Sequence, residues 1–186
     1  MRVIAGSLKG RRLSAPTWDG LRPTSDKLRE TLFNILAPRI AGARVFDGYA
    51  GTGALGIEAI SRGAASVTFV ERDRRAQALI AENLAHCGIA EGYAIIRASV
   101  ARALEMLRER RAPDRFDIML LDPPYGSDGL DEVLAPAGDL LAPGGILALE
   151  HARKRRPPET AGSLFRSRDV PSGDSGLAFY EVRCLL

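Results

Sequence analysis

Through the middle of the chain, between residues 43 and 150, short apolar runs alternate with segments whose apolar positions recur every three to four residues. The runs predict strands, and the periodic segments predict helices. The expected strands are Arg44–Asp47, Ser66–Glu71, Tyr93–Arg97, Phe116–Leu121 and Gly145–Glu150, and the expected helices are Ala54–Ser61, Asp73–Cys87, Ser99–Arg110 and Gly129–Leu141.

Some of the expected strands are apolar throughout, as in Ile118-Met119-Leu120-Leu121. Such strands are buried on both faces, which is typical of a parallel sheet covered by helices. Strand, helix and strand at this spacing give right-handed crossovers. The sequence therefore predicts an α/β fold with a doubly wound, mostly parallel, Rossmann-like sheet.

The two ends of the chain depart from this alternation. Near the C-terminus, two further runs, Phe165–Val170 and Leu177–Leu185, flank the turn-rich segment Pro171–Gly176, and they predict an antiparallel hairpin that completes the sheet. At the front, Arg2–Ala5 and Arg11–Ser14 predict a small hairpin around Gly6–Gly10.

A helix is expected to begin at Ser25 or Asp26. Its apolar face contains Leu28, Leu32, Ile35 and Leu36, which leaves Lys27, Arg29 and Glu30 outside. We expect residues 1–42 to be an extension docked on a main domain that covers residues 43–186.

Composition excludes several classes of protein. A chain of 186 residues with 46% hydrophobic and 26% charged residues can build one sizeable core, so it is globular and not disordered. No apolar run reaches membrane length, we expect no signal peptide because Met1–Gly6 turns polar early, and we see no internal repeat. Two distant cysteines and two histidines do not form a zinc motif. We expect a monomer in a reducing cytoplasm, with no metal and no membrane association.

Charge is unevenly distributed along the chain. Residues 1–44 hold nine basic and three acidic side chains, residues 45–150 hold ten and sixteen, and residues 151–186 hold seven and four. The net charge of +3 therefore hides two basic ends around an acidic middle. The basic ends indicate a polyanionic partner.

The first motif with chemical meaning is Asp47-Gly48-Tyr49-Ala50-Gly51-Thr52-Gly53-Ala54-Leu55-Gly56, at the exit of the first expected strand. Glycines there let the backbone approach a ligand, and the following helix offers free amides. Glu71 lies 20 residues after Gly51, at the tip of the second strand, where a carboxylate can accept hydrogen bonds from ribose hydroxyls. The pair predicts an adenosine-type cofactor.

Asp47 discriminates between cofactor classes. A carboxylate ahead of the glycines would repel the pyrophosphate of a dinucleotide, whereas S-adenosylmethionine carries a sulfonium, an ammonium and no phosphate. We therefore expect S-adenosylmethionine, held by Asp47, Ala50, Gly51, Gly53 and Glu71. A simpler interpretation, in which Asp47 caps the following turn, remains open and is compatible with a cofactor site.

The second motif, Asp122-Pro123-Pro124-Tyr125, directly follows the strand Phe116–Leu121. The two prolines fix the backbone and leave carbonyl groups unpaired. Asp122 and the Pro123 carbonyl can accept the two hydrogens of an exocyclic amine while Tyr125 stacks on the ring that bears it. We expect these four residues to be the catalytic loop, with positioning as their main contribution. A proline turn capped by Asp122 is the structural alternative.

Taken together, these motifs resemble the class I amino-methyltransferases that use S-adenosylmethionine. The front segments Arg2-Val3-Ile4-Ala5-Gly6, Lys9-Gly10-Arg11 and Arg22-Pro23-Thr24-Ser25-Asp26-Lys27-Leu28-Arg29-Glu30 are similar to those of the bacterial RsmD family, and the resemblance covers nearly the whole chain. It implies methylation of guanine N2 in 16S ribosomal RNA, with free RNA or the small-subunit particle as partner. Related enzymes often carry Asp near the third strand tip to meet adenine, whereas here Ser99 or the backbone has to serve.

The front segment also supplies the expected RNA contacts, which are Lys9, Arg11, Arg22, Thr24 and Lys27. A solvated basic surface is the alternative for each. The run Arg153–Arg156 is a second candidate contact, and Trp18 is either a loop anchor or a ring that stacks on RNA.

Four other functions remain possible from the residues alone. An adenine-N6 methyltransferase acting on DNA or RNA would use the same acceptor chemistry, and a glutamine-amide methyltransferase could use a similar proline loop. A ribosome-binding factor without catalysis would need no such loop. An NAD reductase would share the glycine-rich motif.

Overall fold

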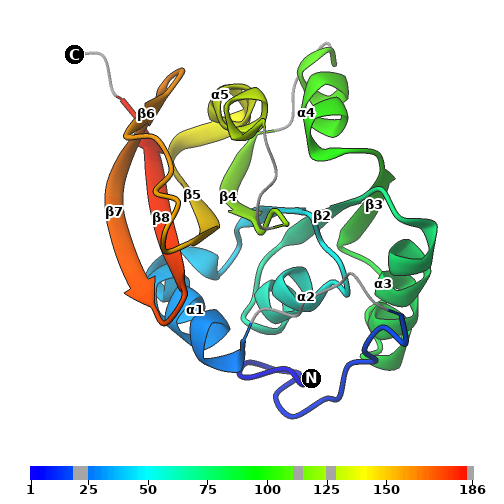
Figure 1. Ribbon diagram of the computed structural model, residues 1–186. Coiled ribbons are helices and arrows are strands. Elements are labelled where there is room, and N and C mark those ends of the chain that lie inside the picture. The colour runs from blue at the N-terminus through cyan, green and yellow to red at the C-terminus, as the bar shows by residue number, and fades with distance from the viewer. Residues whose placement is uncertain (19–24, 111–114, 125–128, 184–186) are drawn as a thin grey trace.

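The computed structural model describes residues 1–18, 25–110, 115–124 and 129–183. An eight-stranded sheet lies between two layers of helices (Figure 1). The strand order is β3-β2-β1-β4-β5-β8-β7-β6. Strands β1 to β5 pair in parallel, and β5, β8, β7 and β6 pair antiparallel. This arrangement confirms the expected doubly wound sheet with an antiparallel C-terminal hairpin.

The central elements follow the apolar pattern closely. The parallel strands are β1 Arg44–Gly48, β2 Ser66–Glu71, β3 Tyr93–Arg97, β4 Phe116–Leu121 and β5 Leu141–Ala152. The helices are α1 Asp26–Ile40, α2 Ala54–Ser61, α3 Arg74–His86, α4 Val100–Arg108 and α5 Leu130–Leu140. Ser25 caps α1 and Asp73 caps α3 through their side chains, as polar residues at helix starts commonly do.

The C-terminal strands are β6 Thr160–Ala161, β7 Leu164–Ser172 and β8 Ser175–Val182. The turn between β7 and β8 is tighter than expected, because Ser172 pairs directly with Ser175. At the front, the expected hairpin forms around one antiparallel bridge between Arg2 and Arg12, and Val3 donates to the Arg11 carbonyl at 2.9 Å. Next to this pairing, Ile4 and Ala5 donate their backbone N–H groups to the Glu58 carboxylate of α2.

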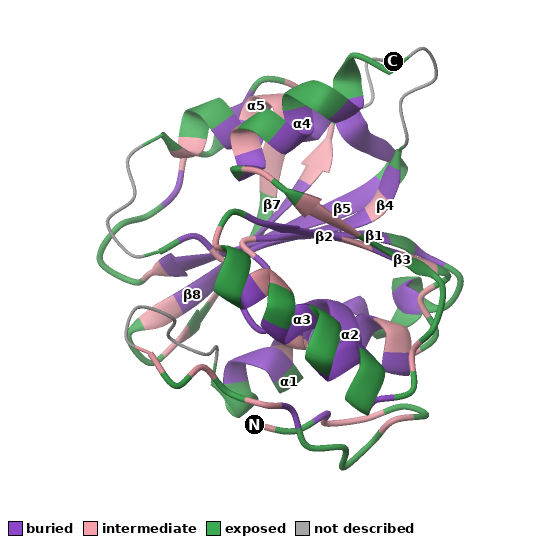
Figure 2. Cartoon of the chain, turned by 90° about the vertical axis from the view of Figure 1, so that its right-hand side faces the viewer, coloured by how far each residue is buried: buried purple, intermediate pink, exposed green. Residues whose placement is uncertain are grey.

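Two apolar cores lie on opposite faces of the sheet. One joins α1, α2 and α3 to the sheet, and the other joins α4 and α5 to it (Figure 2). Leu28, Leu32 and Leu36 of α1 belong to the first core, together with Val3 from the front segment. Within the described residues, no helix is both long and apolar enough to cross a membrane.

Arg29 corrects the expected burial pattern of α1. The spacing of apolar residues in this helix predicts an exposed Arg29 side chain, yet the side chain is fully buried. Residues of the front segment cover this helix face, and Nη2 of Arg29 donates to the Arg2 carbonyl at 2.7 Å and to Asp26 at 2.8 Å. Burial lowers the pKa of Arg29. A second layer of chain over the helix, which local periodicity does not reveal, accounts for the difference.

Strand order reverses between β1 and β4, which are neighbours although they are distant in the sequence. Ligands of open α/β sheets bind beyond the carboxyl ends of the strands at such a point. The backbone N–H of Asp122 donates to the Gly48 carbonyl at 3.4 Å, so the loops after β1 and β4 meet there. The fold thus brings the two sequence motifs together.

Candidate functional site

A cleft of about 920 Å³ lies beyond the carboxyl ends of β1, β2 and β4. This volume is at the upper end of the range for small-molecule sites. Its charged lining is mostly acidic, with two arginines, Arg72 and Arg75, against six carboxylates, which are Glu71, Asp73, Asp122, Glu132, Glu150 and Asp174. An excess of carboxylates favours a cationic ligand over one that carries phosphates.

The loop between β1 and α2 forms one wall of the cleft. Ala50 donates to the Val70 carbonyl at 3.0 Å, and Gly53 donates to the Ala50 carbonyl at 2.7 Å, so the loop turns back tightly against β2. Gly53 is the N-cap of α2 and has a φ of 77°, a left-handed conformation that favours glycine. Ala50 and Gly51 line the cleft, whereas Gly53 supports the turn from behind.

Glu71 connects this loop to the tip of β2. One carboxylate oxygen accepts the Gly51 N–H at 3.0 Å. The other accepts the amides of Arg72 at 2.8 Å and Asp73 at 2.9 Å. Each carboxylate oxygen has two lone pairs, so Glu71 can hold the loop and still accept a hydrogen bond from a ligand hydroxyl.

Asp47 lies beneath the loop and does not line the cleft. The side chain is 1% exposed, and its Oδ2 accepts the Gly56 N–H at 2.8 Å. Its Oδ1 has no hydrogen-bond partner among the described residues. Burial raises the pKa of Asp47 well above its usual value, and the nearby carboxylates of Asp122 and Glu71 add to the increase. Asp47 therefore fixes the start of α2, as the capping interpretation expects.

The loop after β4 forms the facing wall. Asp122, Pro123 and Pro124 all line the cleft, with Asp122 partly exposed and Pro123 buried. Tyr125, which was expected to stack on the acceptor ring, lies outside the described residues. The arrangement places a carboxylate and a rigid backbone opposite the loop that contains Ala50 and Gly51.

Ser99 caps α4 and lines the same cleft. Its Oγ accepts the Arg102 N–H at 3.3 Å, and its neighbours Ala98 and Val100 also line the wall. These residues after the third strand thus line the cleft, and the adenine contact expected there stays a prediction. The wall there combines small apolar surface with one hydroxyl.

Among the described residues, the expected RNA contacts Lys9, Arg11 and Lys27 do not line the cleft. Lys9, Arg11 and Lys27 are exposed, and Arg11 donates to the His86 carbonyl at 3.4 Å. Arg22 and Thr24 fall outside the described residues. Because Arg11 binds the end of α3, the front segment is attached to the same helix layer that supports the cleft.

Sequence reasoning missed several residues of the cleft. Tyr49 lines it with a φ of 63°, and burial raises the pKa of its hydroxyl. Trp18 and Arg75 also line it, and the Arg75 guanidinium lies 4.9 Å from the centre of the Trp18 ring. The acidic residues Glu132 and Glu150 complete the far wall. Tyr49 has a left-handed backbone, which non-glycine residues rarely adopt and which the sequence does not reveal.

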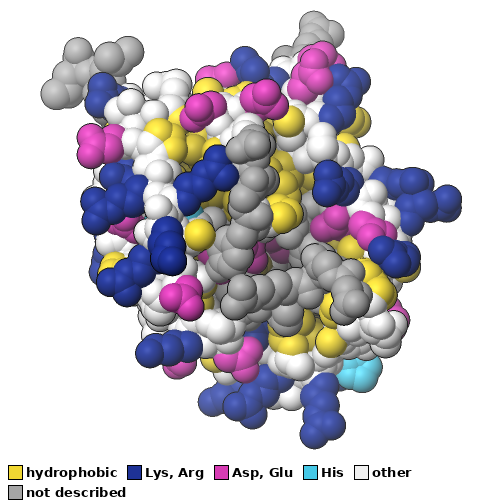
Figure 3. Space-filling view, viewed as in Figure 1, with side chains coloured by type: hydrophobic (Ala, Val, Ile, Leu, Met, Phe, Trp, Pro, Cys, Tyr) yellow, Lys and Arg dark blue, Asp and Glu magenta, His cyan; other side chains and the backbone are white. Residues whose placement is uncertain are grey.

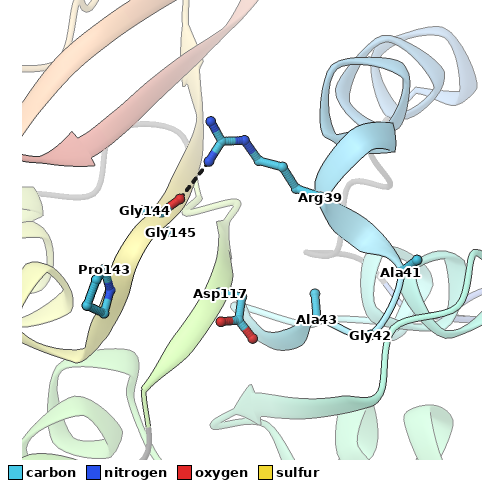
Figure 4. Close-up of a pocket in the computed structure, with 8 residues that line it drawn as sticks. All are labelled: Arg39, Ala41, Gly42, Ala43, Asp117, Pro143, Gly144 and Gly145. Atoms are coloured by element: carbon cyan, nitrogen blue, oxygen red, sulfur yellow. Dashed lines mark hydrogen bonds between the residues drawn. The ribbon is translucent and has the colours of Figure 1, made fainter.

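A smaller pocket of about 340 Å³ lies at the opposite, amino-terminal edge of the sheet (Figure 4). Its charged side chains are engaged with the protein itself. Arg39 donates to the Gly144 carbonyl at 2.6 Å, and Asp117 forms an ion pair with Arg44. The larger cleft, where the two motifs meet, is therefore the better candidate. Among the described residues, no cluster of three or more His, Cys, Asp or Glu side chains is arranged to bind a metal.

Comparison with known proteins gives matches over the whole chain. The model of the family described as "Conserved hypothetical protein 95" matches residues 1–181. YlbH of Bacillus subtilis, named provisionally as an rRNA methyltransferase, is 38% identical over 185 residues, which are 98% of this chain and 100% of that protein. Ribosomal RNA small subunit methyltransferase D of Escherichia coli K12 is 41% identical over 150 residues, 81% of this chain and 71% of the relative.

A solved structure shares the fold over the same extent. It is yhhF of Escherichia coli, also described provisionally as a methyltransferase, and it superposes with a TM-score of 0.84 at 33% identity. The match covers 98% of each chain. The front segment and the C-terminal hairpin are thus part of the shared architecture.

Proposed function

The chain belongs to the family described as Conserved hypothetical protein 95, the RsmD family that its motifs resemble, and on this premise we propose that it methylates guanine N2 in 16S ribosomal RNA. The methyl donor in this proposal is S-adenosylmethionine. The observation that carries the reaction is the meeting of the Gly51 loop and the Asp122 loop across one acidic cleft.

The donor fits the residues of the cleft. S-adenosylmethionine supplies a methyl group activated by a positively charged sulfur. The small size of Ala50 and Gly51 lets a ligand approach the loop closely, Glu71 accepts from ribose hydroxyls, and the wall at Ser99 receives the adenine. Asp47 accepts the Gly56 N–H and so fixes the start of α2 beneath the loop. Its carboxyl group also lies below the position proposed for the cationic ligand.

The acceptor is held by the loop after β4. Asp122 and the Pro123 carbonyl accept the two hydrogens of the guanine amine and orient its nitrogen towards the methyl group, while Tyr125 stacks on the base. A bond forms between the amine nitrogen and the methyl carbon while the bond between sulfur and that carbon breaks. The electron pair of the broken bond goes to sulfur. The surplus proton passes from the amine to Asp122 or to solvent. Positioning, more than strong basicity, supplies the acceleration.

The remaining expectations concern the partner and the setting. The front extension, residues 1–42, binds RNA phosphates through Lys9, Arg11, Arg22, Thr24 and Lys27. Residues 43–186 form the methyltransferase domain. The substrate is 16S ribosomal RNA, free or within the small-subunit particle. A monomeric state and a cytoplasmic location stay predictions.

A panel of acceptors tests this function. The protein and radiolabelled S-adenosylmethionine are incubated in parallel with protein-free 16S RNA, small subunits, DNA and bulk protein. Label that enters 16S RNA, free or in subunits, supports the proposal. Label in DNA or in protein alone would replace it, and labelling of none of the four would contradict it. An NAD reductase would in addition show no affinity for S-adenosylhomocysteine.

A further inference from the structure

The basic turn, which we define as Arg153–Arg156, directly follows β5. Because β5 runs parallel to β4, its carboxyl end lies at the same edge of the sheet as Asp122. Glu150, near the end of β5, lines the cleft. The basic turn therefore borders the acceptor side of the cleft.

The basic turn is attached to the hairpin that closes this side of the cleft. Arg153 donates its backbone N–H to the Asp174 carbonyl at 2.8 Å and its Nη1 to the Gly173 carbonyl at 3.3 Å. The neighbouring residues Ser172, Asp174 and Ser175 line the cleft. The turn and the tip of the β7–β8 hairpin thus form one continuous rim.

The chain after the basic turn is fixed as well. The Pro157 carbonyl accepts from Nη1 of Arg166 at 2.7 Å, and the Glu159 carbonyl accepts the Arg166 N–H at 2.8 Å. The Pro158 carbonyl accepts the buried Tyr180 hydroxyl at 2.7 Å. Burial raises the pKa of Tyr180 to about 12, so this donor keeps its proton at neutral pH. A backbone held at both ends adds little backbone ordering cost when its side chains bind a ligand.

The rim and the wall beneath it carry opposite charges. All four side chains of the basic turn are exposed, whereas the adjacent wall carries Glu132, Glu150 and Asp174. Figure 3 shows Lys and Arg side chains gathered on the side of this face that carries β5, β7 and β8. Such a wall repels phosphates and the rim attracts them, which suits a nucleotide whose base enters the cleft while its backbone stays outside.

The basic turn and the front segment are attached to different parts of the fold. Residues 1–14 contact α2 and α3 on the side of β2 and β3, while β5 is followed in the sheet by β8, β7 and β6. Trp18 of the front segment and Asp174 beside the basic turn both line the cleft, whereas Arg11 binds the far end of α3 at His86. Among the described residues, the basic turn is therefore a basic surface at the rim of the cleft that is separate from the one proposed at the front.

We propose that the basic turn is a second docking surface for RNA phosphates, on the acceptor side of the cleft. The proposal rests on the proposed function for the identity of the polyanion. It assigns the turn to backbone contacts, which position the strand without reading its sequence.

A pair of double variants tests this proposal. Lys154→Gln with Arg156→Gln removes two charges from the turn and leaves Arg153, which holds the hairpin tip. Arg39→Gln with Arg44→Gln removes two exposed charges at the opposite edge of the sheet and serves as the matched control. Affinity for 16S RNA is measured for each protein at several salt concentrations, since every phosphate contact adds about 0.7 to 0.9 to the slope of log affinity against log salt.

The first variant is expected to reduce this slope by about 1 to 2 and to leave S-adenosylhomocysteine affinity unchanged. The control is expected to keep the wild-type slope. Equal slopes for wild type and the first variant, or an equal loss in both variants, would overturn the proposal. Because binding is measured without transfer, a wild-type protein that binds RNA and methylates nothing would refute the proposed function separately.

Discussion

The carboxamide of Asn83 clamps the backbone of Ser14, with Oδ1 accepting the Ser14 N–H at 2.7 Å and Nδ2 donating to its carbonyl at 3.2 Å. Nδ2 also donates to the Thr52 carbonyl at 3.0 Å. One fully buried side chain on α3 thereby joins the front segment to the loop after β1. The segment proposed to dock RNA and the loop proposed to hold the cofactor share a single support.

Replacing Asn83 by Leu is expected to destabilise the protein and to weaken cofactor binding. The change leaves three backbone groups without their partner, at a cost of about 2 to 4 kcal/mol in the free energy of unfolding. Urea unfolding measures this loss, and calorimetric titration with S-adenosylhomocysteine measures the affinity. Ser14→Ala is the control, because it removes only the exposed hydrogen bond to Glu82. Equal losses in the two variants would contradict the role of Asn83.

Glu71→Ala is expected to lower the affinity for S-adenosylhomocysteine by about 10- to 100-fold. The change removes a charged acceptor for ribose and frees the Gly51 amide that positions the loop. Calorimetric titration below the melting temperature of the variant provides the measurement. Glu91→Ala, at an exposed position before β3, is expected to bind as wild type does. An unchanged affinity of the Glu71 variant would remove this residue from the site.

Asp122→Asn is expected to slow methyl transfer by about 100-fold or more while cofactor affinity stays near that of wild type. An amide in place of the carboxylate presents donor hydrogens to the amine and misorients it, a loss comparable to removing one preorganised group from an active site. Single-turnover transfer from labelled S-adenosylmethionine measures the rate. Glu132→Gln removes another carboxylate from the cleft wall and is the control. If both variants transferred methyl groups at the wild-type rate, Asp122 would have no part in holding the acceptor.

The raised pKa of Asp47 predicts how the stability of the protein depends on pH. Its pKa is raised in the folded state, so the folded protein binds a proton more tightly than the unfolded chain does. Stability from this group is therefore greatest below the unfolded pKa of about 4 and is lost as pH rises towards the folded pKa. Urea unfolding from pH 4 to pH 8 should show wild type losing stability relative to Asp47→Asn, which keeps an acceptor for Gly56. Parallel curves for the two proteins would contradict a raised pKa.

The apolar pattern was sufficient to predict the sheet and its helices, because parallel strands such as Phe116–Leu121 are buried on both faces and their sequence shows it. The positions of the two motifs were predictable as well, because the loops that follow parallel strands lie at the same edge of the sheet. Burial of Arg29 and the clamp of Asn83 were not, because each depends on a front segment that is remote in sequence. The acidic wall at Glu132 and Glu150 likewise arises only when α5 and β5 are packed together.

The identity of the methylated atom tests the central claim most directly. Ribosomal RNA labelled with radioactive S-adenosylmethionine is digested to nucleosides, which are then separated and compared with standards. The account predicts that the label migrates as N2-methylguanosine, and that it disappears with Asp122→Asn. Label in N6-methyladenosine, or in any nucleoside methylated elsewhere than on guanine N2, would contradict it.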